Sequence, residues 1–97
     1  MSKITFIARM TVKPEKRDEF ISLCRQLEKY VAEHEPDVLL YEFFKLREEH
    51  RYAILECFPD AAVEARHMNS AKLAEFAPKI GACLIGTWER EYLDDLV

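Results

Sequence analysis

Two neighbouring apolar segments, residues 38–46 and 51–58, place the strongest constraint on how this chain folds. Side chains of a β-strand alternate between the two faces of its sheet, and here both sets are apolar. In the first segment Leu40, Phe44 and Leu46 alternate with Leu39, Tyr41 and Phe43. The polar turn at residues 47–50 predicts that the two strands form an antiparallel hairpin. Helices can cover one face of such a sheet, so the other face needs a second sheet or a partner subunit.

The remaining segments have the periodicities of strands and helices. Residues 4–12 alternate and predict a strand, and residues 84–93 predict the last strand, with Trp88 and Arg90 on the same side. Between residues 14 and 36, apolar side chains recur every three or four positions, and Pro suits the first turn of a helix. We therefore expect one long helix with a single apolar stripe.

Two capping residues organise the stretch that follows residue 58. Pro59 ends the strand because it cannot donate to a sheet ladder, and the Asp60 carboxylate caps the next helix. Ser70 provides a second cap, which opens a helix that Pro78 is expected to shorten or kink and that Gly81 ends. The order strand, helix, strand, strand, helical pair, strand predicts an α+β, ferredoxin-like split β-α-β fold with an antiparallel four-stranded sheet.

Length and composition narrow the classes of protein that fit. The 97 residues make one small domain, residues 1–97, and a chain this short gains stability by association. The apolar runs are too short to span a bilayer and the first residues lack the pattern of a signal peptide, so we expect no membrane and a cytoplasmic location. A formal charge of −4 without a run of Lys or Arg indicates that nucleic acid is not a partner.

The spacing of Gly, Cys and His disfavours the common cofactor sites. With two glycines the chain has no Gly-rich loop to hold a pyrophosphate, so we expect no nicotinamide, flavin or nucleotide. Its three cysteines are far apart, which indicates buried free thiols. Closely spaced Cys or His ligand pairs are absent from the sequence, so no metal is expected.

The stretch from Glu56 to Ser70 resembles the antibiotic biosynthesis monooxygenase (ABM) family. In that family a strand ends in Glu-x-aromatic, here Glu56-Cys57-Phe58, and a His follows nine residues after the aromatic residue, here His67. The first strand, the long helix opened by Lys-Pro and the Leu-Tyr-Glu strand at residues 40–42 extend the resemblance over most of the chain. The resemblance implies a homodimer with the architecture of a dimeric α+β barrel. We expect its two facing sheets to enclose a chamber that His67 reaches.

The resemblance also implies a chemistry, the oxygenation of a small phenol- or quinol-like aromatic molecule by dioxygen without metal, flavin or haem. His67 shares an inward helix face with Val63 and would be the base that ionises the substrate. The electron-rich anion would then react with dioxygen. The residues expected to contact the substrate are Tyr41, Glu56, Phe58, Arg66 and Trp88.

The charged groups near this site have more than one interpretation. The cation that steadies the substrate anion would be one of Arg9, Arg66 and Arg90. Glu56 is either a buried carboxylate paired with a cation or with His67, or an acid with a raised pKa at a pocket. A lone inward His is also often a packing residue with a satisfied hydrogen bond.

Two alternative functions stay open on the same fold. Similar proteins isomerise small metabolites or degrade haem. A non-catalytic dimer that binds a small ligand is the other alternative. Phe58 and Lys72 stand where the family often has a Trp and a second His, and this favours the binding protein.

Overall fold

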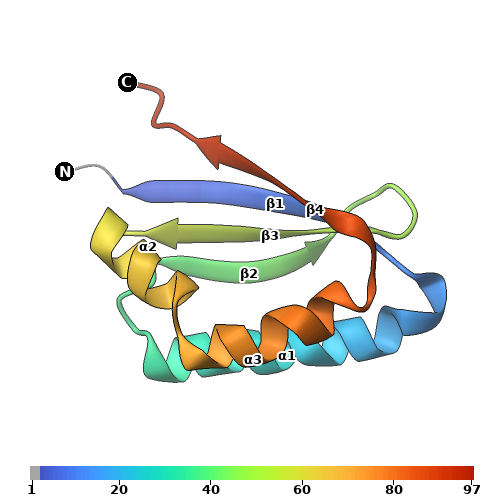
Figure 1. Cartoon of the computed structure of the whole chain (residues 1–97). Coiled ribbons are helices and arrows are strands. Elements are labelled where there is room, and N and C mark those ends of the chain that lie inside the picture. The colour runs from blue at the N-terminus through green and yellow to red at the C-terminus, as the bar shows by residue number, and fades with distance from the viewer. Residues whose placement is uncertain (1–2) are drawn as a thin grey trace.

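The computed structural model describes residues 3–97, and Figure 1 shows how their elements are arranged. In chain order they are β1 (Ile4–Val12), a 3₁₀ turn η1 (Pro14–Lys16), α1 (Arg17–His34), β2 (Leu40–Lys45), β3 (Arg51–Phe58), α2 (Ala61–Met68), α3 (Ala71–Gly81) and β4 (Leu84–Leu93). The strands form one antiparallel sheet in the order β2-β3-β1-β4. This is the ferredoxin-like α+β topology that the sequence predicts.

The predicted caps set the ends of the two short helices. The Asp60 carboxylate accepts a hydrogen bond from the Val63 N–H at 2.9 Å, and the Ser70 hydroxyl accepts one from the Leu73 N–H at 3.2 Å. The expectation that Pro78 shortens α3 is wrong, because the helix continues through it to Gly81. Pro78 lies on the exposed side of α3, where water can satisfy the carbonyl that the ring leaves without a donor.

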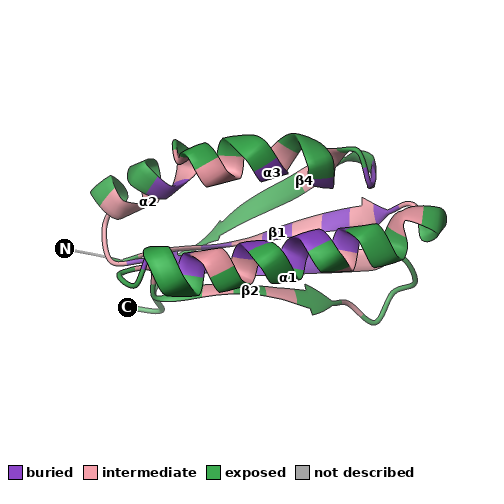
Figure 2. Ribbon diagram, turned by 90° about the horizontal axis from the view of Figure 1, so that it is seen from below, coloured by how far each residue is buried: buried purple, intermediate pink, exposed green. Residues whose placement is uncertain are grey.

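The three helices of residues 3–97 cover the same face of the sheet (Figure 1). The stripe of α1 that faces the sheet is buried, as Figure 2 shows in purple, and consists of Phe20, Leu23, Cys24, Leu27 and Val31. On β1 the inward residues are also buried, namely Phe6, Ala8, Met10 and Val12. Within residues 3–97 no helix has both the length and the apolar composition needed to cross a membrane.

The other side of the sheet, which we call the open face, carries apolar side chains that no element of residues 3–97 covers. Ile7 and Leu55 are half-buried there, and Leu40, Phe44 and Leu93 are 36%, 41% and 42% exposed. This is the two-sided apolar pattern seen in the sequence. The homodimer that would cover the open face stays a prediction.

A bulge in β4 sets its register against β1. Arg9 pairs with Glu89, and Thr11 pairs with Ile85. A step of two residues on β1 thus matches a step of four on β4, so β4 holds two additional residues. Gly86 lies within the bulge with φ at 75°, in the left-handed region that glycine adopts without strain. Because two residues are one full period of a strand, side chains on either side of the bulge keep the same inward or outward direction.

Candidate functional site

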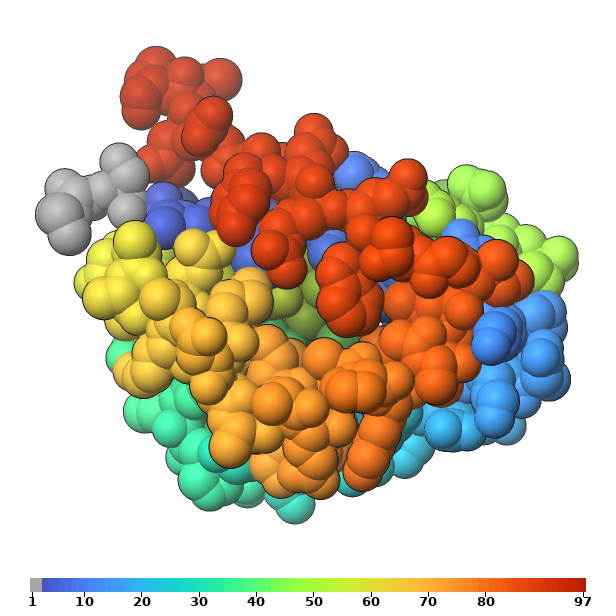
Figure 3. All heavy atoms as spheres, viewed as in Figure 1, coloured from blue at the N-terminus to red at the C-terminus, as the bar shows by residue number. Residues whose placement is uncertain are grey.

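A cavity of about 160 Å³ lies between the sheet and the helices that cover it. Figure 3 shows it as a hollow between α3 and β4. Most of its lining is apolar, and the lining includes Ala8, Tyr41, Glu56, Met68, Trp88 and Arg90. The cavity belongs to a single chain, and the expected chamber between two facing sheets stays a prediction. The short side chains of Ala8 on β1 and Ala77 on α3 leave space inside the covered face itself.

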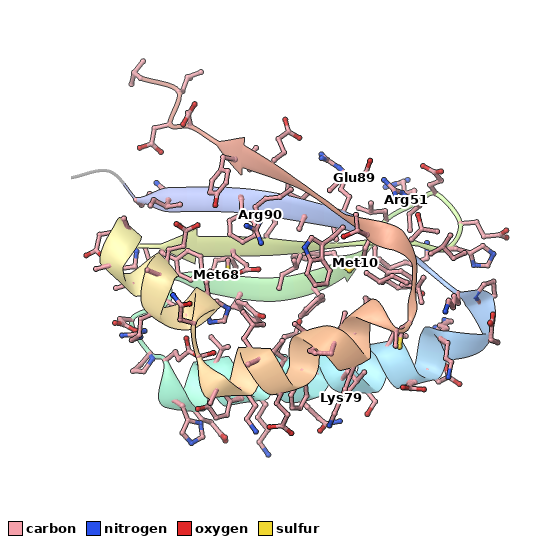
Figure 4. All side chains as sticks on the ribbon, viewed as in Figure 1. Met10, Arg51, Met68, Lys79, Glu89 and Arg90 are labelled. Carbon is pink, nitrogen blue, oxygen red and sulfur yellow. The ribbon has the colours of Figure 1, made fainter. Side chains whose placement is uncertain are left out.

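The β4 register places two large side chains at this cavity. Arg90 lies directly opposite Ala8 on β1, and Trp88 lies two positions earlier on the same side of β4. Figure 4 shows Arg90 and Met68 directed into the space between β4 and the helices. The Arg90 guanidinium lies 4.6 Å from the centre of the Phe6 ring, in the geometry of a cation–π contact.

Glu56 supplies an acidic group to an otherwise apolar wall. It lies on β3, faces the helices and is 6% exposed. Burial raises the pKa of its carboxyl to about 8; Arg90 opposes this rise, while Glu64 and Glu35 add to it. Glu56 is therefore largely protonated at neutral pH, and a modest rise in pH ionises it.

His67 lies behind Glu56 as seen from the cavity. Its side chain is 1% exposed and does not line the cavity. Nδ1 lies 2.8 Å from Glu35 Oε1, so we assign the ring proton to Nδ1, which donates to that carboxylate. The ring packs against Tyr41 and Phe58, with ring centres 4.9 Å and 5.5 Å away.

This tautomer leaves the second ring nitrogen free to accept a proton. His67 Nε2 lies 3.6 Å from Glu56 Oε1, slightly beyond hydrogen-bond distance. Within residues 3–97 neither of these two buried atoms has a hydrogen-bond partner. Since buried polar atoms are normally paired, the two atoms form a site where a proton can pass between the carboxyl group and the imidazole.

Tyr41 provides the other polar atom of the buried wall. Burial holds the pKa of its phenol well above the usual range, and the charges of Glu56, Cys24 and Glu35 act in the same direction. The hydroxyl therefore stays protonated and can donate a hydrogen bond to an anion in the cavity.

Within the described residues no group of three or more His, Cys, Asp or Glu side chains is arranged to hold a metal ion.

The structure brings together part of the predicted site. Tyr41, Glu56 and Trp88 line the cavity, whereas Phe58 and His67 lie behind its wall. Arg66 is outside the cavity at the surface of α2, where it pairs with Asp37. The two nitrogen–oxygen distances of that pair are 2.8 Å and 2.6 Å, and this hydrogen-bonded contact lowers the pKa of the Asp37 carboxyl.

Sequence reasoning missed Glu35, the partner of the imidazole. Glu35 follows Leu27 and Val31 in steps of four residues, so it continues the buried stripe of α1 just past the helix end. A carboxylate at an inward position, next to a proline that ends the helix, is the signal that could have revealed it. Lys72 lies outside the cavity lining, against the rings of Tyr30 and Phe76.

Comparison with known proteins finds one family and close structural relatives. The sequence pattern of the antibiotic biosynthesis monooxygenase family matches residues 3–79. "Putative monooxygenase YcnE" of Bacillus subtilis is 33% identical over 76 residues, which cover 78% of this chain and 80% of that protein.

Two solved structures extend the match to nearly the whole chain. A protein from Caulobacter crescentus, described as a putative antibiotic biosynthesis monooxygenase, superposes with a TM-score of 0.91 at 25% identity. The match covers 98% of this chain and 91% of that one. A conserved protein from Methanosarcina mazei superposes with a TM-score of 0.87 at 28% identity, over 96% and 92% of the two chains.

Proposed function

The chain belongs to the antibiotic biosynthesis monooxygenase family, and we propose that it is a monooxygenase acting on a small phenol- or quinol-like aromatic substrate. One observation carries the proposal: Glu56, a buried acid with a raised pKa, stands at the wall of an apolar cavity and has His67 behind it. An apolar cavity of about 150 Å³ accepts a benzene-sized molecule. The cavity of about 160 Å³ therefore suits a single aromatic ring.

Glu56 is the group we assign to contact the substrate. In the resting site its carboxyl is protonated and His67 Nε2 is free. Transfer of the Glu56 proton to Nε2 creates an imidazolium, which the Glu35 carboxylate stabilises. The Glu56 carboxylate then accepts the proton of the substrate hydroxyl and leaves a phenolate in the cavity. In this proposal Glu56 is the catalytic residue, and His67 acts through it.

The phenolate provides the electrons for the reaction with dioxygen. One oxygen atom forms a new bond to the ring and the other leaves as water, so a hydroquinone becomes a hydroxyquinone. The substrate supplies all four electrons, and we propose that no cofactor takes part. The Tyr41 hydroxyl donates a hydrogen bond to the anion, and the positive charge of Arg90 at the cavity wall adds a favourable field.

The proposal includes a homodimer and a cytoplasmic location. A second copy would cover the apolar open face, where Phe44 and Leu40 are exposed on the single chain. All three cysteines lie within the described residues and are free and buried, which suits a reducing compartment. A haem group is larger than the single ring that this cavity suits, so the haem-degrading alternative does not fit it.

Oxygen uptake with a panel of substituted hydroquinones tests the function. We expect uptake that survives dialysis against a chelator, and one labelled oxygen atom per product molecule when the gas is ¹⁸O₂. Glu56→Gln should lower the rate at least about 100-fold, since it removes the proton acceptor. Glu33→Gln, on the exposed side of α1, is the matched control.

Two results would overturn the proposal. The first is an unchanged rate in Glu56→Gln, which would remove Glu56 from the chemistry. The second is tight binding of aromatic ligands with no oxygen uptake across the panel, which would favour the non-catalytic binding protein instead.

A further inference from the structure

Arg90 is a charged group at the cavity that lacks an acidic partner. Arg9, Arg51 and Arg66 each form a salt bridge with a carboxylate, at 2.9, 3.2 and 2.6 Å. Within residues 3–97 Arg90 forms none, and its guanidinium lies over the Phe6 ring at the cavity wall. A guanidinium beside an apolar cavity and without a carboxylate partner has donors available for a ligand.

The position of Arg90 relative to Glu56 defines a distance that a ligand has to bridge. In the sheet register Arg90 lies beside Ala8 on β1, and Ala8 lies beside Ile54 on β3, two residues before Glu56. With strands about 4.8 Å apart and a rise of about 3.3 Å per residue, the Cα atoms of Arg90 and Glu56 are about 12 Å apart. The Arg90 guanidinium reaches back over the ring of Phe6, the register partner of Glu56, so one ligand in the cavity can contact both side chains.

The charges around this space favour an anion at Arg90. Glu56, the acid on the opposite wall, is largely protonated at neutral pH and does not repel a carboxylate. Glu64, another nearby acid, is not among the lining residues of the cavity and accepts a hydrogen bond from the Tyr92 hydroxyl at 2.9 Å. A carboxylate and a guanidinium form paired, charge-assisted hydrogen bonds, which are stronger beside an apolar wall than in water.

We propose that the natural ligand is a hydroxylated aromatic carboxylate, held with its hydroxyl at Glu56 and its carboxylate at Arg90. This rests on the proposed function and names the substrate class of the same site. Neutral phenols enter the cavity but lack the second contact. The acidic group therefore selects the ligand and fixes which hydroxyl reaches Glu56.

Calorimetric titration of the full chain in the absence of oxygen tests the proposal. The ligands are 2,5-dihydroxybenzoate, its neutral amide and hydroquinone, which share the ring and both hydroxyls. We expect the acid to bind at least about tenfold more tightly than the amide. Trp88 is the single tryptophan of the chain and lines the cavity, so the shift of its indole N–H signal in an NMR spectrum locates the bound ligand.

Arg90→Gln is the decisive variant. It should remove the preference for the acid over the amide, while Arg47→Gln, the same change in an exposed turn, should keep it. Equal affinity for acid and amide, persistence of the preference in Arg90→Gln, or no binding of the acid would each overturn the proposal. Since no turnover is measured, a protein that binds the acid but consumes no oxygen refutes the proposed function alone. A protein that oxidises neutral hydroquinones without preferring the acid refutes this inference alone.

Discussion

His67 Nε2 and Glu56 Oε1 face each other across 3.6 Å in the interior, and within residues 3–97 neither atom has a hydrogen-bond partner. Leaving a buried polar atom unpaired is costly, so such a pair is uncommon in a region that serves packing alone. On its other side the imidazole is held by Glu35 at 2.8 Å. The pair therefore combines a fixed ring with an open proton position next to a cavity, and it leads directly to the first two predictions.

Replacing Glu56 by Gln should change how stability depends on pH. The folded protein holds the Glu56 proton up to about pH 8, whereas the unfolded chain releases it near the ordinary pKa of a carboxyl group. Between those values the folded state binds more protons, so the free energy of unfolding falls as pH rises, by up to about 1.4 kcal/mol per pH unit. Urea unfolding at several pH values should show a flatter dependence in Glu56→Gln than in Glu33→Gln. Parallel curves for the two variants would contradict the prediction.

Removal of the imidazole should destabilise the fold strongly. His67→Ala leaves the Glu35 carboxylate buried without its partner and empties space beside Tyr41 and Phe58. We expect a loss of about 3 kcal/mol in the free energy of unfolding. His34→Ala removes an exposed ring at the end of α1 and should cost far less. Similar losses in the two variants, measured by urea unfolding, would show that the Glu35 contact contributes little.

Filling the cavity from its floor should block ligands while the fold persists. Ala8→Leu adds three carbon atoms to the space beside Arg90, at a cost of about 1–3 kcal/mol if neighbouring side chains have to move. The Trp88 indole signal should then stay unchanged on addition of 2,5-dihydroxybenzoate. Ile7→Leu, on the open face, should respond as the natural chain does. A normal response in Ala8→Leu would place the ligand elsewhere.

A charged residue placed on the open face should weaken the dimer if a second copy covers that face. Light scattering of the natural chain should give about twice the 11.4 kDa mass of one chain. Phe44→Asp should lower that mass towards one chain, because an unpaired carboxylate at an interface is costly. Ala74→Asp, on the exposed side of α3, should keep the larger mass. A natural chain that is monomeric at micromolar concentration would refute the dimer.

The alternation of apolar residues was sufficient to predict the fold. Strands β1, β3 and β4 have the predicted bounds, and β2 is shorter than the expected 38–46. Leu39 and Leu46, just outside its ends, still donate backbone hydrogen bonds to β3. At the start of that segment the Val38 N–H donates to the Glu35 carbonyl in a turn. Apolar periodicity identifies which residues face a core, but it does not show how closely the opposite layer approaches.

The site was less predictable because its geometry depends on contacts across the fold. His67 was correctly expected to point inward, yet its neighbours come from three other elements, and Glu35 is 32 residues away in sequence. Arg66 was an equally reasonable cation from sequence until Asp37 was found beside it. Arg90 could be selected only after the bulge in β4 fixed its register with Ala8.

The two additional residues at Gly86 give this architecture a simple route to new specificity. Because they amount to one complete strand period, straightening the bulge with both residues kept would slide the rest of β4 along β1 without turning any inward side chain outward. Trp88 would then stand opposite Ala8 in place of Arg90. A substitution that removes the left-handed conformation at Gly86 can thus exchange a cationic wall for an aromatic one, with no change in the length of the chain.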